Sequence, residues 1–154
     1  MELNKLSMAL GADPDQNTVK AYAEFENLLS ALRKKHMAAH LVVVINQHIA
    51  ELNAFAGSAI AITKELRKHK MEILKLIEKE ASLVTKNHYR KLWLVIGMVA
   101  FGLPLGIVFG AGFDNMPLMA IGMPIGMIFG FAIGNALDKK AFENGNQLDL
   151  IIKY

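Results

Sequence analysis

The five histidines are the residues of this sequence best suited to metal chemistry. His36 and His40 stand four positions apart, and in a helix that spacing puts two imidazoles on one face, as in many zinc sites. No carboxylate occupies the matching turns between them, and no H-E-x-x-H pattern occurs. The pattern therefore favours solvated or membrane-proximal histidines, and the sequence predicts no metal site.

Other catalytic chemistry is not indicated. Cysteine is absent, which excludes disulfides, thiolate metal sites and a cysteine nucleophile. The glycine-rich stretch lacks the Lys-Ser/Thr ending of a phosphate-binding loop, and no catalytic triad or paired carboxylates are apparent. The net charge of +3 comes without a recognisable nucleic-acid motif. We therefore expect no enzyme activity, no cofactor and no nucleic-acid partner.

The segment between Lys91 and Asp138 is the dominant feature of the chain. Its only formal charge is Asp114, near the middle. That residue divides the segment into two apolar arms, 92–111 and 116–137, each close to the roughly 20 residues that an α-helix needs to cross a bilayer. The arms are apolar on all sides, unlike a surface helix of a soluble protein, which has a single apolar stripe. We predict a transmembrane helical hairpin over 89–138.

Glycine recurs every four residues in both arms, and residues with this spacing share one helix face. Such rows of small residues allow close backbone contact between membrane helices, so they are predicted to be the packing faces of a glycine zipper. The seven glycines are Gly102, Gly106, Gly110, Gly122, Gly126, Gly130 and Gly134.

A fold about Asp114 predicts how the rows meet. Gly106 would face Gly122, and Gly102 would face Gly126. Gly130 and Gly134 would lie opposite the larger Met98 and Leu94, which leaves part of the second row for another copy of the chain. A homo-oligomer is therefore expected.

Charged and aromatic residues mark the predicted membrane boundaries. Basic residues flank the hairpin and are missing from its loop, so the positive-inside rule predicts that both termini are cytoplasmic, in a multi-pass protein of the inner (plasma) membrane. The predicted boundary residues are Arg90, Lys91, Trp93, Asp114, Asp138, Lys139 and Lys140.

The rest of the chain is predicted to be a cytoplasmic helical region over 17–88, preceded by a segment 1–16 that can form a short helix ending at Gly11. No Gly or Pro lies between Pro14 and Ala56, which favours one long helix or two helices broken near Lys34–His36. The apolar run 38–62 contains a charge and several amides, so a buried cytoplasmic helix is favoured over a third span.

A second long helix is expected over 59–86, because no Gly or Pro lies between Ser58 and Gly97. It would pair with the first in an antiparallel hairpin and can continue into the first membrane arm as a stalk. The tail 139–154 begins as a helix end with a stop at Gly145, and its last residues fit either a short strand or a docking segment. The predicted fold class is thus an all-α membrane protein, with a cytoplasmic long-helix hairpin followed by a transmembrane hairpin.

The runs YRKLWLVIGMVAFGLPLGIVFG and GMPIGMIFGFAIGNALDKKAFENG resemble those of small bacterial glycine-zipper membrane proteins, including uncharacterised ones of Bacteroidetes type. The resemblance covers about residues 89–146. It implies self-association in membranes, and some glycine-zipper proteins form channels. No functional residue beyond the glycines can be matched.

Two functions follow as expectations. The first is a self-associating membrane protein whose cytoplasmic helices bind an unknown protein partner or sense a stimulus. The second is an oligomeric pore or channel, including a regulated permeabilising effector. Neither arm has a stripe of polar residues, which a water-filled pore normally requires, so the first is favoured.

Overall fold

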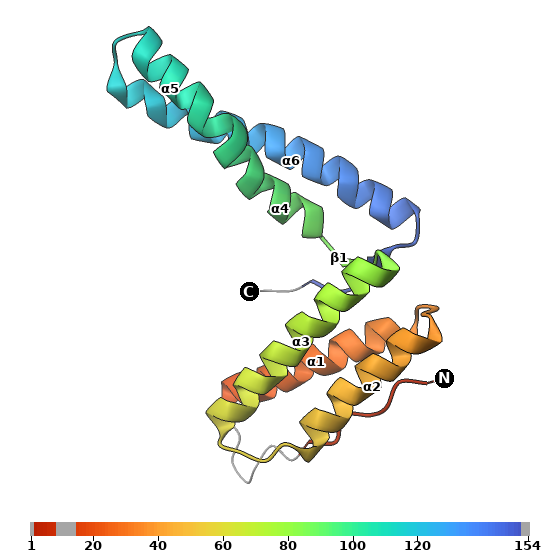
Figure 1. The fold of residues 1–154 in the computed structure, drawn as a ribbon. Helices are drawn as coiled ribbons and strands as arrows, with labels where there is room; N and C mark the ends of the chain where they lie inside the picture. Colours follow the sequence, from red (N-terminus) through yellow and green to blue (C-terminus); the bar gives the residue numbers. More distant parts are fainter. Residues whose placement is uncertain (1, 9–14, 152–154) are drawn as a thin grey trace. The chain divides into compact units, whose positions relative to one another are not determined.

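A computed structural model of the chain describes residues 2–8 and 15–151 (Figure 1). These residues form two compact units, and each is described by itself. The first unit contains the described residues up to Val84, together with Leu148–Leu150. The second contains Thr85–Gln147 and Ile151. Both units are predominantly helical.

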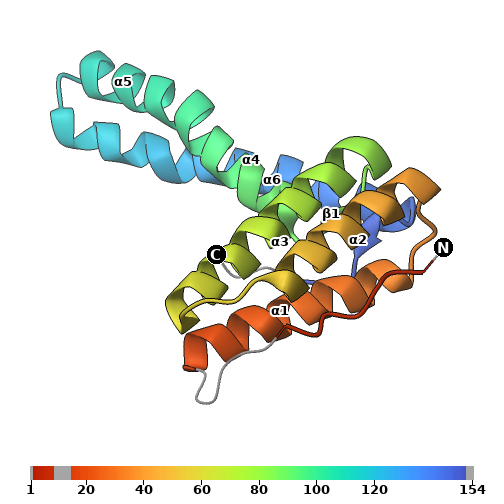
Figure 2. The ribbon, with the colours of Figure 1, turned by 60° about the horizontal axis from the view of Figure 1, so that its bottom comes forward.

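Three helices build the first unit: α1 (Gln16–Arg33), α2 (Ala39–Ala54) and α3 (Ala59–Ala81). α3 packs against both α1 and α2 (Figure 2). The sequence allowed either one long helix after Pro14 or two helices broken near Lys34–His36. The second alternative is confirmed, because α1 ends at Arg33 and α2 begins at Ala39. The predicted two-helix hairpin is therefore replaced by three helices around one core. The fully buried core side chains include Phe25, Leu28, Leu29, Leu32, Ile45, Ile49, Leu52, Leu66, Ile73 and Ile77.

The ends of these helices follow from local capping. The Asp15 carboxylate accepts the backbone N–H of Thr18 at 2.9 Å and so caps the start of α1. Ser58 caps α3 in the same way through the N–H of Ala61. α3 stops where Ser82 adopts a left-handed conformation with φ 53°, and the N–H of Leu83 bonds back to the carbonyl of Ile77 at 3.1 Å.

The predicted stalk is therefore wrong. α3 ends at Ala81, and residues Val84–Thr85 form a short strand, β1, before the next helix starts. A Schellman-like stop normally uses glycine. Here Ser82 takes the left-handed position, so the sequence carries no glycine to signal the break.

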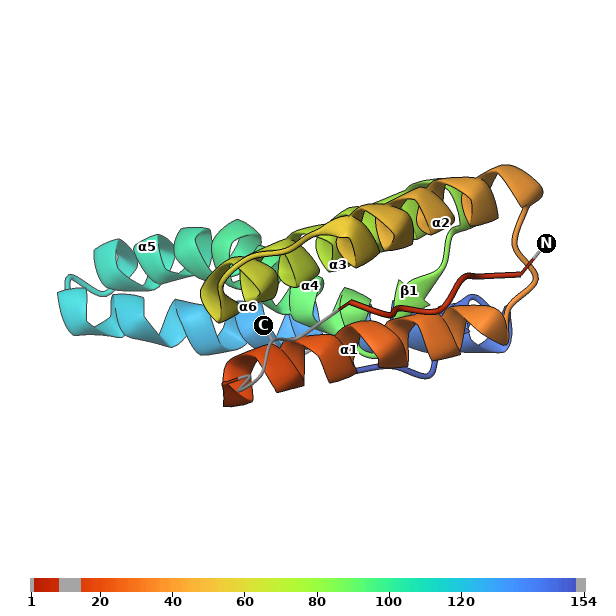
Figure 3. The ribbon, with the colours of Figure 1, turned by 90° about the horizontal axis from the view of Figure 1, so that it is seen from below.

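Residues 2–8 are extended, not helical, and lie along α1 and α2 (Figure 3). Two amides of α2, seven residues apart, bond to the backbone of this segment, and Leu3, Leu6 and Met8 are buried in the core. The predicted short helix is thus wrong over the part of the chain that the structure describes; its proposed end at Gly11 lies outside those residues. The bonds join Asn4 N to Asn46 Oδ1 at 2.8 Å, Asn46 Nδ2 to Glu2 O at 3.1 Å, Ser7 N to Asn53 Oδ1 at 2.7 Å, and Asn53 Nδ2 to Lys5 O at 3.1 Å.

The second unit is a helical hairpin. Its first arm runs without interruption through α4 (His88–Gly97), a π-helical turn η1 (Met98–Gly102) and α5 (Leu103–Gly112). A 3₁₀ turn η2 (Met116–Leu118) then leads into α6 (Met119–Glu143). The arms lie antiparallel, side by side (Figure 1). The predicted helical hairpin about Asp114 is confirmed, with arms longer than expected.

Two Schellman motifs end the helices of this hairpin. After α5, Asp114 is left-handed, and the N–H groups of Asp114 and Asn115 bond to the carbonyls of Ala111 and Gly110. After α6, Gly145 has φ 72° and the same pair of bonds closes on Phe142 and Ala141. The predicted stop at Gly145 is confirmed.

The described residues of the C-terminal tail contain a two-residue strand and also dock on the core of the first unit, so they show features of both interpretations. Gln147–Leu148 forms strand β2, which pairs with β1 in a two-stranded sheet. Leu148 is fully buried in the core of the first unit. Residues 152–154 of the predicted tail lie outside the described part of the chain.

Candidate functional site

Burial in the helical hairpin is the reverse of that in a soluble protein. Between positions 92 and 137 every buried residue is a glycine. Large apolar side chains are exposed instead, including Val95, Val99, Ile107, Val108, Ile121, Ile128 and Phe129. The continuous helices His88–Gly112 and Met116–Glu143, of 25 and 28 residues, are long and apolar enough to cross a membrane.

The glycines lie where the two arms touch. A Cβ placed on Gly126 would meet the backbone of Gly97 and Gly102 at 2.5 Å, and one on Gly122 would collide with the backbone of Gly102 and Gly106. The predicted pairings of Gly102 with Gly126 and of Gly106 with Gly122 are thus observed. At the turn end, a Cβ on Gly110 would collide with the side chain of Met119.

The glycine row of α6 is also covered by the first arm at the end away from the turn. A Cβ on Gly130 would collide with the carbonyl of Trp93, and one on Gly134 would lie 2.6 Å from the Cα of Arg90. The prediction that these two glycines are left for another copy of the chain is therefore wrong. Met98 and Leu94 do not block the contact, because the backbone of α4, and not these side chains, faces the groove.

Gly97 is a packing residue that the sequence pattern missed. It precedes Gly102 by five positions and so breaks the four-residue repeat. The π-helical turn between them restores the alignment, because a wider turn brings residues five apart onto one face. Pro104 supplies a local reason for this turn, since proline lacks an N–H and its ring crowds the carbonyl four residues earlier. The signal in the sequence was the five-residue spacing from Gly97 to Gly102, which is followed closely by Pro104.

Asp138 continues the four-residue row of α6 by one more step, but it acts as a cap. The residue is buried, with 6% of its surface exposed. Oδ1 accepts the N–H of Tyr89 at 3.1 Å, and Oδ2 accepts the N–H of Arg90 at 3.0 Å. Both groups belong to the first turn of α4, whose N–H groups have no partner within the helix. Asn87 precedes that helix without a side-chain capping bond, so the cap comes from the other arm.

The other predicted boundary residues lie at the ends of the arms. The Arg90 guanidinium stands 5.5 Å above the ring of Phe131, in cation–π contact. Lys139 is 3.8 Å from Glu143, and Lys140 is in the last turn of α6. Lys91 and Trp93 follow Arg90 on α4, and Asp114 is in the turn.

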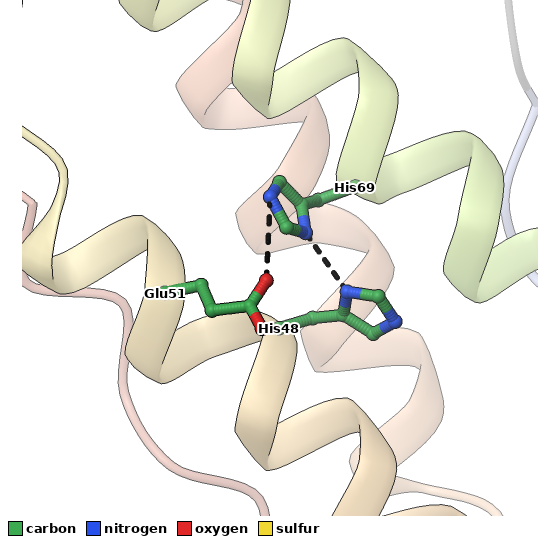
Figure 4. Close-up of side chains that lie close together, drawn as sticks. All are labelled: His48, Glu51 and His69. Atoms are coloured by element: carbon green, nitrogen blue, oxygen red, sulfur yellow. Dashed lines mark hydrogen bonds and ion pairs between the residues drawn. The ribbon is translucent and has the colours of Figure 1, made fainter.

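A separate group of titratable side chains lies in the first unit, where α2 meets α3 (Figure 4). His48 and Glu51 project from α2 and His69 from α3. The Nδ1 atoms of the two imidazoles are 2.8 Å apart, in hydrogen-bond contact, and the rings meet edge to face. His69 Nε2 lies 3.8 Å from Glu51 Oε2. One ligand atom from each of the three residues lies within 4.8 Å of the others.

Two further carboxylates complete this cluster. Glu72 Oε2 is 3.7 Å from His48 Nδ1 and 3.8 Å from His69 Nδ1, and Glu65 Oε2 is 3.6 Å from His69 Nε2. Burial lowers the pKa of His69, and the neighbouring His48 lowers it further, whereas Glu72 and Glu51 act in the opposite direction. The imidazole of His69 is thereby biased toward its neutral, metal-binding form.

The histidine pair singled out in the sequence is not the one that the fold assembles. His40 pairs with Glu80 of α3 at 2.8 Å on an exposed surface, and His36 lies in the link between α1 and α2. His48 and His69 are 21 residues apart, so only the docking of the two helices brings them together. The available signal was a shared H-x-x-E spacing, His48 with Glu51 and His69 with Glu72.

Comparison with protein-family models, with curated proteins and with solved structures found no match to this chain. The resemblance to small glycine-zipper membrane proteins therefore stays a prediction.

Proposed function

We propose that this chain is an integral membrane protein whose hairpin anchors a three-helix domain at the cytoplasmic face of the inner membrane, where that domain binds a partner or responds to a ligand. The burial pattern carries this proposal: the hairpin hides glycines and exposes large apolar side chains. In water that arrangement leaves a large apolar surface uncovered. In lipid it is favourable, because packing and not hydrophobic burial joins the helices.

The proposed orientation rests on charge. Lys86, Arg90 and Lys91 precede the apolar part of the first arm, and two lysines follow the apolar part of the second. The turn at 113–115 contains no basic residue. By the positive-inside rule, the turn then faces outward and the three-helix domain inward.

The absence of cysteine from the sequence makes the orientation straightforward to test. Asn115→Cys places a single thiol in the turn, and Lys64→Cys places one on the exposed surface of α3. A membrane-impermeant maleimide should label Asn115→Cys in intact spheroplasts and Lys64→Cys only in inverted vesicles. Labelling of both from the same side, or release of the wild-type chain by alkaline carbonate, would overturn the proposal.

Self-association would require surfaces other than the glycine rows, because the two arms of one chain already occupy them. The native mass of the chain in mild detergent tests it. Dimers or larger species that persist in Ile128→Asn, which changes an exposed residue of α6, would show that the contact between copies does not need Ile128.

An oligomeric pore is the second candidate. The π-helical turn, Pro104 and Pro124 favour it, because they interrupt the regular hydrogen bonding of the arms and so give positions at which a helix can bend. The residues 92–137 contain only three polar side chains, Asp114, Asn115 and Asn135. A water-filled path normally needs a polar lining, so the anchor is the better-supported proposal. Leakage of dye from liposomes containing the purified chain, absent from protein-free liposomes, would favour the pore instead.

A further inference from the structure

The cluster between α2 and α3 has an internal repeat. Each helix contributes a histidine and, three residues later, a glutamate: His48 and Glu51 from α2, His69 and Glu72 from α3. Residues three apart in a helix share a face, so each pair points toward the facing helix. Metal sites in helical bundles are built in this way, from pairs at i and i+3 on facing helices.

The distances fit a single metal ion. His48 Nδ1, His69 Nδ1 and Glu72 Oε2 form a triangle with sides of 2.8, 3.7 and 3.8 Å. A point inside that triangle lies about 2 Å from all three atoms, which is the usual distance from zinc to nitrogen or oxygen ligands. Tetrahedral coordination would need the two imidazole nitrogens about half an ångström further apart.

Solvent can reach the cluster, and the surrounding residues hold its imidazoles in place. The side chains of His69 and His48 are 7% and 21% exposed, whereas those of Glu72 and Glu51 are 44% and 66% exposed. The imidazoles are thus held by packing, and the carboxylates are free to close over an ion that enters from solvent. Glu65 faces the other nitrogen of His69, where ligating histidines commonly have a carboxylate partner that fixes the ring.

We propose that His48, His69 and Glu72 form a zinc site that joins α2 to α3, and that the exposed carboxylate of Glu51, which lies beside the other nitrogen of His69, turns toward the ion as the fourth ligand. Two imidazoles with two carboxylates suit Zn²⁺ and its transition-metal neighbours better than Mg²⁺ or Ca²⁺, which prefer oxygen ligands alone. The site does not depend on how the hairpin meets the membrane, so it stands apart from the anchoring proposal.

The test uses the full chain in detergent, stripped of metal by a chelator and then titrated with ZnCl₂ in a calorimeter. We expect one equivalent to bind and the Tm of the chain to rise with added ZnCl₂, because a ligand that binds the folded state stabilises it. MgCl₂ at the same concentrations should not raise the Tm. CoCl₂ should give the visible absorption of a tetrahedral ion.

Variants locate the site. His48→Gln and His69→Gln should each weaken zinc binding about tenfold or more, whereas the matched control His40→Gln, on the same helix but paired with Glu80, should bind like the wild type. Circular dichroism checks that each variant is folded; His48 is the less buried of the pair, so its variant keeps the test decisive if His69→Gln unfolds.

Zinc binding that is absent in the wild type, or that His40→Gln weakens as much as His48→Gln, would overturn the proposal. Unchanged binding in both Glu51→Gln and Glu72→Gln would overturn the four-ligand assignment.

Discussion

Asp138 near the end of α6 caps the first turn of α4, with its Oδ2 3.0 Å from the backbone nitrogen of Arg90. The same carboxylate accepts the N–H of Tyr89. A single side chain of one arm therefore satisfies two N–H groups of the other, at the end of the hairpin opposite the turn. The glycine row of α6 and its terminal aspartate act together: the glycines allow the arms to approach, and the aspartate fixes their register.

Replacing this cap should weaken the hairpin where its two ends meet. Asp138→Ala leaves two N–H groups without their acceptor, and hydrogen bonds to a charged group contribute about 1.5–3 kcal/mol each to stability. We expect a lower Tm in detergent and faster hydrogen exchange at the amides of Tyr89 and Arg90. Asp138→Asn, which keeps one acceptor oxygen, should lose less. The neighbouring exposed Lys139→Ala is the control; an equal loss there would argue against the capping role.

The sequence was sufficient to predict the hairpin because its signals are local. Length, the lone Asp114 and the four-residue glycine repeat are all readable within one segment. Gly97 was missed because helical periodicity assumes a regular α-helix, and a π-helical turn changes the spacing that defines a face. The close contacts at Gly130 and Gly134 were missed for a related reason. The prediction matched residues at equal distance from the turn and compared the sizes of their side chains, whereas these two glycines contact the backbone of the other arm.

The first unit was harder to predict because its features depend on tertiary contacts. Asn46 and Asn53 looked like polar interruptions of an apolar run, but they hold residues 2–8 in an extended form. His48 and His69 acquire a common environment only after α2 and α3 dock. Neither relationship follows from spacing within one helix.

Close packing of the arms predicts a strong size dependence at Gly126. Gly126→Leu would force its side chain into the backbone of Gly97 and Gly102, and overpacking of this kind costs about 1–3 kcal/mol. The fraction of helix that survives titration with SDS, measured by circular dichroism, should fall at lower SDS than for the wild type. Ile128→Leu, at a position that is 68% exposed, should behave like the wild type. If the two variants unfold together, Gly126 is not a packing residue.

The extended N-terminal segment should detach when its amide partners are removed. Asn53→Ala eliminates the bonds to Ser7 N and Lys5 O, and each net hydrogen bond contributes about 0.5–1.5 kcal/mol. We expect faster hydrogen exchange at the amide of Ser7 and faster proteolysis near residues 5–8. Asn27→Ala, an exposed amide on α1, is the control. Protection of Ser7 that is unchanged in Asn53→Ala would show that burial of Leu6 and Met8 alone holds the segment.

Acid should weaken the start of α1 through Asp15. Hydrogen bonds from the Thr18 hydroxyl and backbone N–H lower the pKa of Asp15 below its ordinary value of 3.8. Because the pKa of the folded state is the lower one, the stabilisation is fully present above the unfolded-state pKa and is lost as the pH falls through the folded-state pKa. The free energy of unfolding of the wild type should therefore decline more steeply below about pH 4 than that of Asp15→Asn, which caps the helix without a titrating group. Urea titrations in detergent at several pH values measure this difference, and parallel curves for the two proteins would mean that Asp15 titrates alike in the folded and unfolded chains.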